Sequence, residues 1–411
     1  MLFHQYVMAI ANAVRDEDGQ RLAALVRISG QEAVNLLRDL RDSRRTSLAR
    51  FSSSIVDPWG EIAIAHVQVL VNIEDKNFVE SYREQAALLN LFLRFFVTKS
   101  GWTLPVLYTV LRDLRELSDK SDQMEKSQTG KAVTKWREDA ARICNKAFSS
   151  CVTDRSSAPE DSRKWGIYYT VGLVLKSYFK VQRTSLSRNV IRALKANNDI
   201  PPLTEYPRAH QVTYKYYLGM LSFLNEDYEQ AEQELTQAFY LCHCQAQSNL
   251  ERILTYLLPL RLLRGHLPSD ELSFRFPALK ALCDPFINAI RKGDLKQFDD
   301  ALNETATQKR LLDLGLYLVF EKAREICIRC LFRRMWISGT SKGTRIPIAM
   351  FHASLRVSGQ DIPVEEAECI VANMIFKGFM RGYVSHEKQM VVLAQTNSFP
   401  KLSTRANPFA Y

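Results

Sequence analysis

The sequence predicts an all-α helical-repeat (TPR-like) solenoid followed by a C-terminal winged helix that carries a small β-hairpin. Three observations lead to this prediction. Before residue 316, apolar residues recur at intervals of three and four, the spacing of one buried helical face. Residues 215–235 contain the spacing of a tetratricopeptide-like helical repeat. Strand-like runs are confined to residues 379–384 and 389–393.

Residues 1–208 are expected to form an N-terminal helical solenoid. Apolar spacing predicts helices there over residues 82–97, 104–117, 136–152 and 165–181. Pro105 falls in the first turn of one of them, where proline is tolerated. The polar stretches 118–134 and 153–163 are expected to be exposed loops, and the Pro-rich segment 197–207 is expected to separate helices.

Residues 209–315 are assigned to further helical repeats. Leu218-Gly219 is followed by Ala231 and Leu235, at the spacing of a tetratricopeptide repeat. Small residues at such positions let two helices cross closely. An irregular helical domain is the alternative for this region.

Residues 316–397 are predicted to be the winged helix. A long amphipathic helix is expected over 316–336, and a shorter helix is expected to end before Gly378. The two strand-like runs then form the hairpin. Residues 398–411 are left as a tail.

The chain carries a net charge of +10, and the excess is concentrated at its C-terminal end. From Leu316 onward there are 13 basic and seven acidic residues. A basic surface attracts nucleic-acid phosphates or an acidic protein partner. A solvated basic face without a partner is the alternative. The composition, 46% hydrophobic and 24% charged, excludes a mostly disordered protein.

The sequence predicts no enzyme, no metal and no cofactor. Cys242-His243-Cys244, read as helical, would splay its two thiols apart, and no second ligand pair accompanies it. Gly130-Lys131 lacks the rest of a phosphate-binding loop. The eight cysteines suggest no disulfide framework, which favours a reducing compartment. No apolar run is long enough to predict a membrane span.

Several motifs resemble those of PCI-domain proteins. They are residues 101–106 (Gly-Trp-Thr-Leu-Pro-Val), 162–166 (Ser-Arg-Lys-Trp-Gly), 212–217 (Val-Thr-Tyr-Lys-Tyr-Tyr), 256–259 (Tyr-Leu-Leu-Pro) with Gly265-His266, 378–386, and 397–400 (Asn-Ser-Phe-Pro). The resemblance is to the family of PCI-domain-containing protein 2, its yeast mRNA-export counterpart and the fungal COP9-signalosome-subunit-12-like proteins. It covers about residues 80 to 400. Ser398 departs from the family's Asn-Pro-Phe-Pro.

The resemblance implies a non-catalytic PCI scaffold subunit, nuclear with the cytoplasm as a second compartment. Its implied partners are a larger PCI-domain scaffold protein and a small acidic disordered peptide shared with the proteasome lid. RNA and double-stranded DNA would bind to the winged helix, in a complex coupling transcription to mRNA export. The alternative is a protein-assembly subunit of a COP9-signalosome-related or splicing-linked complex, with no direct nucleic-acid role.

The candidate nucleic-acid contacts are the basic residues of the winged helix. They are Arg333, Arg334, Lys342, Arg345, Arg356, Lys377, Arg381 and Lys388. The helix after Asp361, its expected N-cap, begins with Glu365 and Glu366, which would repel phosphate at a major groove. We therefore expect phosphate contacts without base readout. Contact with a protein partner is the alternative. Arg324 and Arg329 are the candidate residues for binding the acidic peptide.

Overall fold

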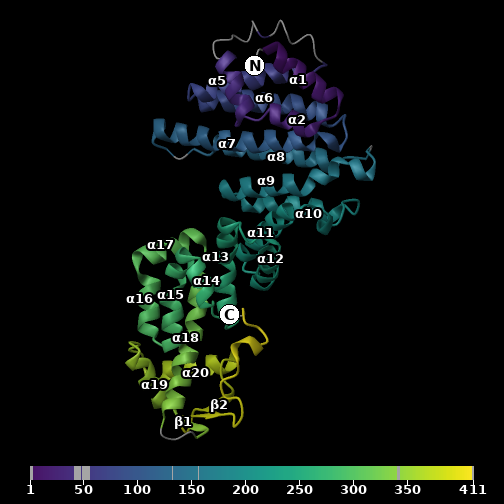
Figure 1. The fold of residues 1–411 in the computed structure, drawn as a ribbon. Coiled ribbons are helices and arrows are strands. Elements are labelled where there is room, and N and C mark those ends of the chain that lie inside the picture. Colours follow the sequence, from purple (N-terminus) through teal and green to yellow (C-terminus); the bar gives the residue numbers. More distant parts are fainter. Residues whose placement is uncertain are drawn as a thin grey trace. The chain divides into compact units, whose positions relative to one another are not determined.

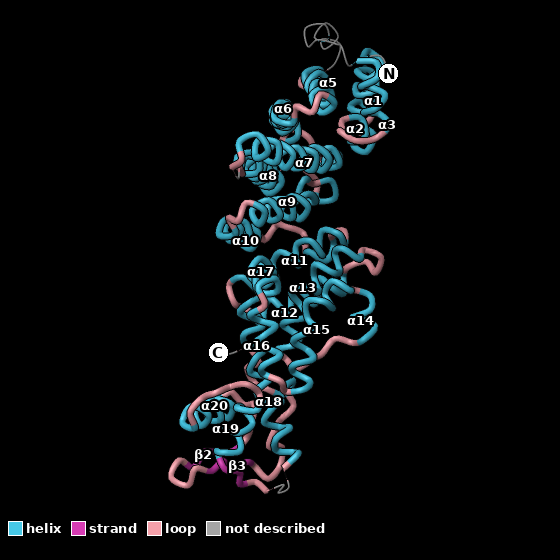
Figure 2. The backbone as a smooth tube through the Cα atoms, turned by 90° about the vertical axis from the view of Figure 1, so that its left-hand side faces the viewer, coloured by secondary structure: helices cyan, strands magenta, loops and turns pink. Residues whose placement is uncertain are grey.

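The computed structural model describes residues 3–40, 48, 56–131, 133–155, 157–339 and 343–409. The chain divides into two compact units, Met1–Tyr217 and Leu218–Tyr411. Figures 1 and 2 show that both units are mainly helical and that the strands lie together in the second unit. The predicted fold class is confirmed.

The first unit is a succession of helices in which each packs against the next. Its helices are α1 (Phe3–Arg15), α2 (Gly19–Leu25), α3 (Gln31–Leu40), α5 (Trp59–Glu74), α6 (Phe78–Phe96), α7 (Leu104–Thr129), α8 (Lys135–Val152), α9 (Ile167–Lys180) and α10 (Ser187–Ala196). The pairs α5 with α6, α6 with α7, α7 with α8 and α8 with α9 are in contact. Trp59 is fully buried and its ring meets Phe92 and Phe95 edge-on, at 6.1 and 5.3 Å. The succession of helices, each packed against the next, is the solenoid that the sequence predicts.

The expected loop over 118–134 is wrong, because α7 continues to Thr129 and ends at Gly130 in the left-handed conformation. The polar residues of this stretch find partners inside the fold. Ser121 Oγ donates to the carbonyl oxygens of Leu117 and Phe78. The buried Asp122 carboxylate accepts the first backbone N–H groups of α8. The polar residues of this stretch led us to expect an exposed loop. Polar groups can be buried, however, when their hydrogen bonds are made within the fold.

The stretch 153–163 is mostly exposed as expected, but part of it is buried. Asp154, Ser162 and Arg163 are buried. Asp154 accepts hydrogen bonds from Arg163 Nη2 at 3.1 Å and from Ser162 Oγ at 2.9 Å. These bonds hold the pKa of Asp154 below its usual value although burial opposes them. A buried ion pair therefore organises the turn before α9.

The second unit joins further helices to a small sheet. The elements are α12 (Tyr228–Leu241), α13 (Gln247–Leu263), α14 (Asp270–Arg275), α15 (Pro277–Lys292), α16 (Leu295–Asn303), α17 (Thr305–Leu314), α18 (Tyr317–Ser338), β1 (Arg345–Pro347), α19 (Ile348–Val357), α20 (Val364–Phe376), β2 (Gly382–Ser385) and β3 (Met390–Leu393). Helix α11 (Arg208–Leu224) crosses the boundary between the units.

Gly219 has the role that the repeat spacing predicts. A Cβ atom on it would lie 2.7 Å from Leu235 Cγ, so only glycine lets α11 and α12 approach this closely. Helix α12 ends at Leu241, so Cys242, His243 and Cys244 lie in the turn after it and not on a helix as expected.

The winged helix has one strand more than the expected hairpin. The sheet is antiparallel in the order β1-β3-β2. In β1 only Ile346 is buried, opposite Val391 of β3. Three residues are too few to give a readable alternation, which is why the sequence did not reveal this strand. Helix α20 begins at Val364 after Pro363, so the expected N-cap role of Asp361 is wrong.

The described residues include no helix that is both long and apolar enough to cross a membrane.

His66 on α5 is the buried group from which we expect a pH dependence. It is fully buried, its ring is tilted against that of Tyr6 at 6.2 Å, and neither ring nitrogen has a hydrogen-bond partner among the described residues. Burial lowers the pKa of His66 to about 4. The unfolded chain binds the proton below its ordinary pKa of 6.5. Stability is therefore lost as the pH falls from 6.5 toward 4 and is unaffected above 6.5.

We predict that His66→Phe flattens this dependence. In the wild type, this one group makes the free energy of unfolding fall by up to about 1.4 kcal/mol per pH unit. The measurement is denaturant unfolding at a series of pH values, compared with His66→Phe and with the exposed control His266→Phe. Equal slopes in wild type and His66→Phe would contradict the prediction.

Candidate nucleic-acid interface

The sheet of the winged helix has one buried and one open face. Ile346, Val391 and Val384 lie opposite one another and face the core. The neighbouring row consists of Arg345, Val392 and Tyr383. Because side chains alternate between the faces of a sheet, this second row points away from the core.

The open face places Arg345 and Arg381 near the same end of the sheet. Arg345 is exposed at the start of β1, and Tyr383, in its row, is 62% exposed. Arg381 precedes β2, and its carbonyl oxygen accepts the N–H of Ala394 just beyond β3. The backbone N–H of Leu393 donates to the Thr344 carbonyl oxygen, so β1 begins beside the end of β3. The sequence alone did not indicate that these two arginines approach each other.

The other exposed candidates are more scattered. Arg333 and Arg334 lie near the end of α18, and Lys388 lies in the turn between β2 and β3. Arg356 is exposed at the far end of α19, beside α16. None of these side chains, nor those of Arg345 and Arg381, forms an ion pair with another residue that the structure describes. Lys342 lies outside the described residues.

Lys377 differs from the exposed candidates. Its ammonium group is paired with the Glu325 carboxylate of α18, and both side chains are mostly buried. This ion pair links α20 to α18. Lys377 therefore has a structural partner already, whatever else it contacts.

The acidic start of α20 is where the sequence placed it. Glu365 and Glu366 are exposed in the first turn. Glu368 instead binds the wing, with its Oε1 atom 2.9 Å from His386 Nδ1. This hydrogen bond raises the pKa of His386. The negative charge at this helix end is unsuited to contact with phosphate.

Arg324, a candidate for peptide binding, is held within the chain. Its Nε and Nη2 atoms donate to the two carboxylate oxygens of Asp299 at 2.6 and 2.9 Å. Nη2 also donates to Gln360, whose amide nitrogen donates to Asp299. This network fixes α18 to α16 and to the loop after α19. Its role in binding a partner stays a prediction.

Arg329, the other candidate, is buried under the C-terminal segment. Its Nη2 donates to the carbonyl oxygens of Phe399 at 3.4 Å and Pro400 at 2.7 Å. Residues 398–409, which we call the strap, therefore lie against α18. The sequence left this segment as a tail. Its aromatic residues, Phe399 and Phe409, were the only signal of packing.

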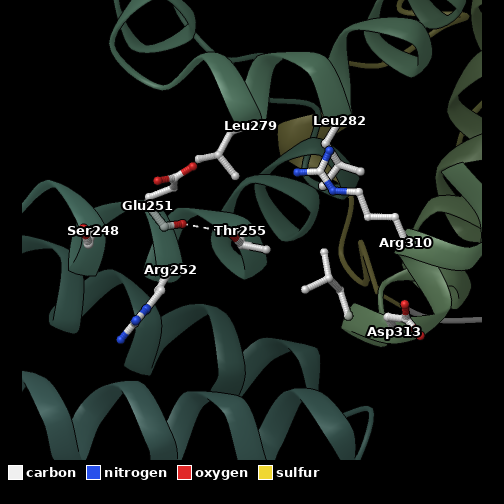
Figure 3. Close-up of a pocket in the computed structure, with 9 residues that line it drawn as sticks. Ser248, Glu251, Arg252, Thr255, Leu279, Leu282, Arg310 and Asp313 are labelled. Carbon is white, nitrogen blue, oxygen red and sulfur yellow. Dashed lines mark hydrogen bonds between the residues drawn. The ribbon is translucent and has the colours of Figure 1, made fainter. Parts of the chain in front are cut away.

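A cleft of about 460 Å³ lies outside the winged helix, between α13, α15 and α17 (Figure 3). Leu279, Leu282 and Leu314 line its apolar part, and Glu251, Arg252, Arg310 and Asp313 line its polar part. The Thr255 hydroxyl in this cleft donates within its own helix to the Glu251 carbonyl. Its lining residues include no histidine or cysteine.

Within the described part of the chain, no three His, Cys, Asp or Glu side chains are grouped so that they could hold a metal ion.

A long α18 that joins helical repeats to a three-stranded winged helix is the arrangement of a PCI domain, and residues 295–395 match the model of that domain family. The chain is also similar over most of its length to curated proteins. It is 33% identical to the protein CSN12 homolog of Mycosarcoma maydis over 97% of each chain. It is 38% identical to the CSN12 homolog of Schizosaccharomyces pombe over 85% of this chain and 84% of that protein. It is 31% identical to PCI domain-containing protein 2 of Xenopus laevis over 98% of each chain. The chain belongs to the family of PCI-domain scaffold proteins that contains the CSN12 homologs and PCI domain-containing protein 2.

We predict that Arg324→Gln lowers the free energy of unfolding of the second unit by about 1–3 kcal/mol, because Asp299 then remains half-buried without its charged donor. The measurement is thermal or denaturant unfolding. The exposed Arg356→Gln is the matched control and is expected to change stability by less than about 0.5 kcal/mol. A fully stable Arg324→Gln protein would contradict the stabilising role of this network.

Proposed function

We propose that this chain is a non-catalytic scaffold subunit of a nuclear complex that couples transcription to mRNA export. In this proposal the winged helix binds RNA and double-stranded DNA without sequence preference. The observation that carries the proposal is the set of exposed basic side chains without ion-pair partners among the described residues. The set is Arg333 and Arg334 at the end of α18, Arg345 and Arg381 at one end of the sheet, and Lys388 in the turn at its other end; we call these five residues together the basic face.

Arginines of this kind suit phosphate recognition. An exposed guanidinium can form two parallel hydrogen bonds with one phosphate, and no competing carboxylate has to be displaced here. The acidic start of α20 keeps that helix away from the base edges. Binding would then depend on phosphate contacts alone and would weaken steeply as salt increases.

We predict that changing Arg345, Arg381 and Lys388 to Glu weakens binding to single-stranded RNA at least about tenfold. Its salt dependence should also become shallower, by about 0.7 in log–log slope for each phosphate that is no longer bound. The measurement is fluorescence anisotropy with several RNA sequences over a salt series. Similar affinities for all sequences are expected.

The control is Lys309→Glu, an exposed cation on α17, outside the winged helix. It should leave RNA binding nearly unchanged. A folded triple variant with wild-type affinity would remove the basic face from the proposal.

The alternative function is a protein-assembly subunit of a COP9-signalosome-related or splicing-linked complex, without a direct nucleic-acid role. Two large apolar side chains favour it. Phe376, at the end of α20, is 86% exposed, and Tyr383 of β2 is 62% exposed. Exposed aromatic residues are typical of protein interfaces. The name of the relatives called CSN12 homolog points the same way.

In either function, the proposed partners are a larger PCI-domain scaffold protein and a small acidic disordered peptide. Phe376 and Tyr383 would contact the larger scaffold protein. Arg324 and Arg329 are retained as candidate contacts of the acidic peptide, although each already has a partner within the chain. The nucleus is the proposed location, with the cytoplasm as a second one.

We predict that replacing Phe376 and Tyr383 by Ser reduces several-fold the recovery of a PCI-domain partner on affinity purification from native extract, followed by mass spectrometry. The physical reason is the loss of apolar area at the interface. Phe274→Ser is the control, because Phe274 is 87% exposed and lies on α14. Undiminished recovery would place the partner on another surface. Export factors in the wild-type sample would support the first function, and splicing or signalosome subunits the alternative.

A further inference from the structure

The strap, residues 398–409, runs along α18 in the direction opposite to that helix. At one end, the ring of Phe399 lies over Trp336 with centroids 5.6 Å apart. In the middle, Arg329 donates to the carbonyl oxygens of Phe399 and Pro400. At the other end, Lys322 Nζ donates to the Phe409 carbonyl oxygen at 3.2 Å. The strap thus covers one side of α18 from Trp336 back to Lys322.

The covered side of α18 carries two cations, Lys322 and Arg329. Lys322 also lies over the Tyr228 ring at 4.8 Å and has the carboxylates of Glu226 and Glu325 nearby.

Lys322, Arg329 and Trp336 follow at intervals of seven residues, so they lie on one side of the helix, about 10.5 Å apart. Arg333, four residues after Arg329, lies on the same side and is exposed. The row of cations therefore starts at the exposed Arg333, which belongs to the basic face. It continues through Arg329 to Lys322, and the strap covers these two residues.

Arg329 is poorly matched to the strap. The acceptors of its Nη2 are neutral carbonyl oxygens, and its Nε, which is buried, has no hydrogen-bond partner among the described residues. Burial lowers the pKa of Arg329, and the positive charge of Arg333 lowers it further. Charge-assisted bonds to an anionic oxygen are about twice as strong as neutral ones. A phosphate would therefore satisfy Arg329 better than the strap does.

The strap is held at few points. Ser398, Phe399 and Pro400 are buried, but residues 401, 403, 404, 406 and 407 are exposed. Its regular structure is a single short turn, Leu402–Thr404.

Two further residues of the strap, Leu402 and Phe409, make contacts with the helical repeats. Leu402 lies against Gly265, where a Cβ atom would collide with it. The Phe409 ring lies 6.2 Å from that of Tyr228 and 5.0 Å from the Arg264 guanidinium.

Arg405 of the strap also lies over the Phe379 ring at 3.7 Å. Most residues after Pro400 are nevertheless exposed, and a segment of this kind opens at a lower free-energy cost than the helices beside it.

We propose that the strap is a displaceable cover over a second phosphate-binding row, Lys322–Arg329–Arg333, and that single-stranded RNA takes the place of the strap on α18. This inference rests on the proposed function, because Arg333 belongs to the basic face. Displacement would lengthen the RNA-binding surface by about three helical turns, from Arg333 back to Lys322.

The test compares three changes in the full chain. Phe409→Ala loosens the far end of the strap, deletion of residues 401–411 uncovers Lys322, and deletion of 399–411 also removes the carbonyl groups that hold Arg329. We expect RNA affinity to rise stepwise, by about threefold or more in the longer deletion, and the log–log salt slope to steepen by about 0.7 for each additional phosphate bound. Phe274→Ala is the matched control.

Hydrogen–deuterium exchange, read on the α18 and α13 segments, checks that the variants are folded and that the strap has left. If the longer deletion does not fold, Phe409→Ala and the shorter deletion carry the test. Adding Lys322→Gln to the shorter deletion should abolish its gain in affinity.

The outcomes separate this inference from the proposed function. Unchanged affinity and slope after release of the strap, or a gain that survives Lys322→Gln, would overturn the covered row and leave the basic face standing. RNA binding by the deletion variants but not by the full chain would support the covered row and overturn the basic face as a sufficient site. Tighter binding of polyglutamate than of RNA to the deletion variants would overturn RNA as the occupant.

Discussion

The second unit depends on the burial of α18, a single helix of 22 residues, about 33 Å long. Its first half packs on α13, α15 and α16, and its second half packs on α19. Phe320 meets Phe286 at a ring distance of 4.4 Å, while Phe332 meets Phe351 at 5.0 Å. Because one unbroken helix belongs to both cores, the winged helix and the helical repeats beside it are joined rigidly along α18.

The same helix sets what the chain can offer to other molecules. Its apolar sides are used for folding, and its charged positions face solvent, the strap or charged side chains of neighbouring elements. Arg324 is held by Asp299 and Arg329 by the strap, whereas Arg333 and Arg334 remain exposed. The proposed RNA contacts and the proposed cover are therefore two consequences of how α18 is buried. The pairing of Lys377 with Glu325 shows that a basic residue of the winged helix can serve the fold instead.

Residue spacing predicted the helices well where apolar residues fall on one face of the helix, as in 316–336 and 82–97. It failed where polar groups are satisfied inside the fold. Ser121 and Asp122 carry α7 well beyond the expected end, since their partners come from α6 and α8. The sequence did not reveal strand β1, because three residues are too few to show a period. Its partner strand is also distant: Ile346 of β1 pairs with Val391 of β3, 45 residues later in the chain. Long-range partners of this kind leave no local signal.

The sequence by itself determined the fold class, the family resemblance and the basic character of the C-terminal region, because all three depend on which residues occur and at what spacing. Only the tertiary structure decided which basic residues are exposed. Arg324 and Arg329 look alike in sequence to Arg333 and Arg334, yet the first two are hydrogen-bonded within the chain and the last two are not among the described ion pairs. The physical reason is that the burial and pairing of a charge depend on groups that folding brings close. Asp299 lies 25 residues from Arg324, and the carbonyl of Pro400 belongs to a residue 71 positions from Arg329.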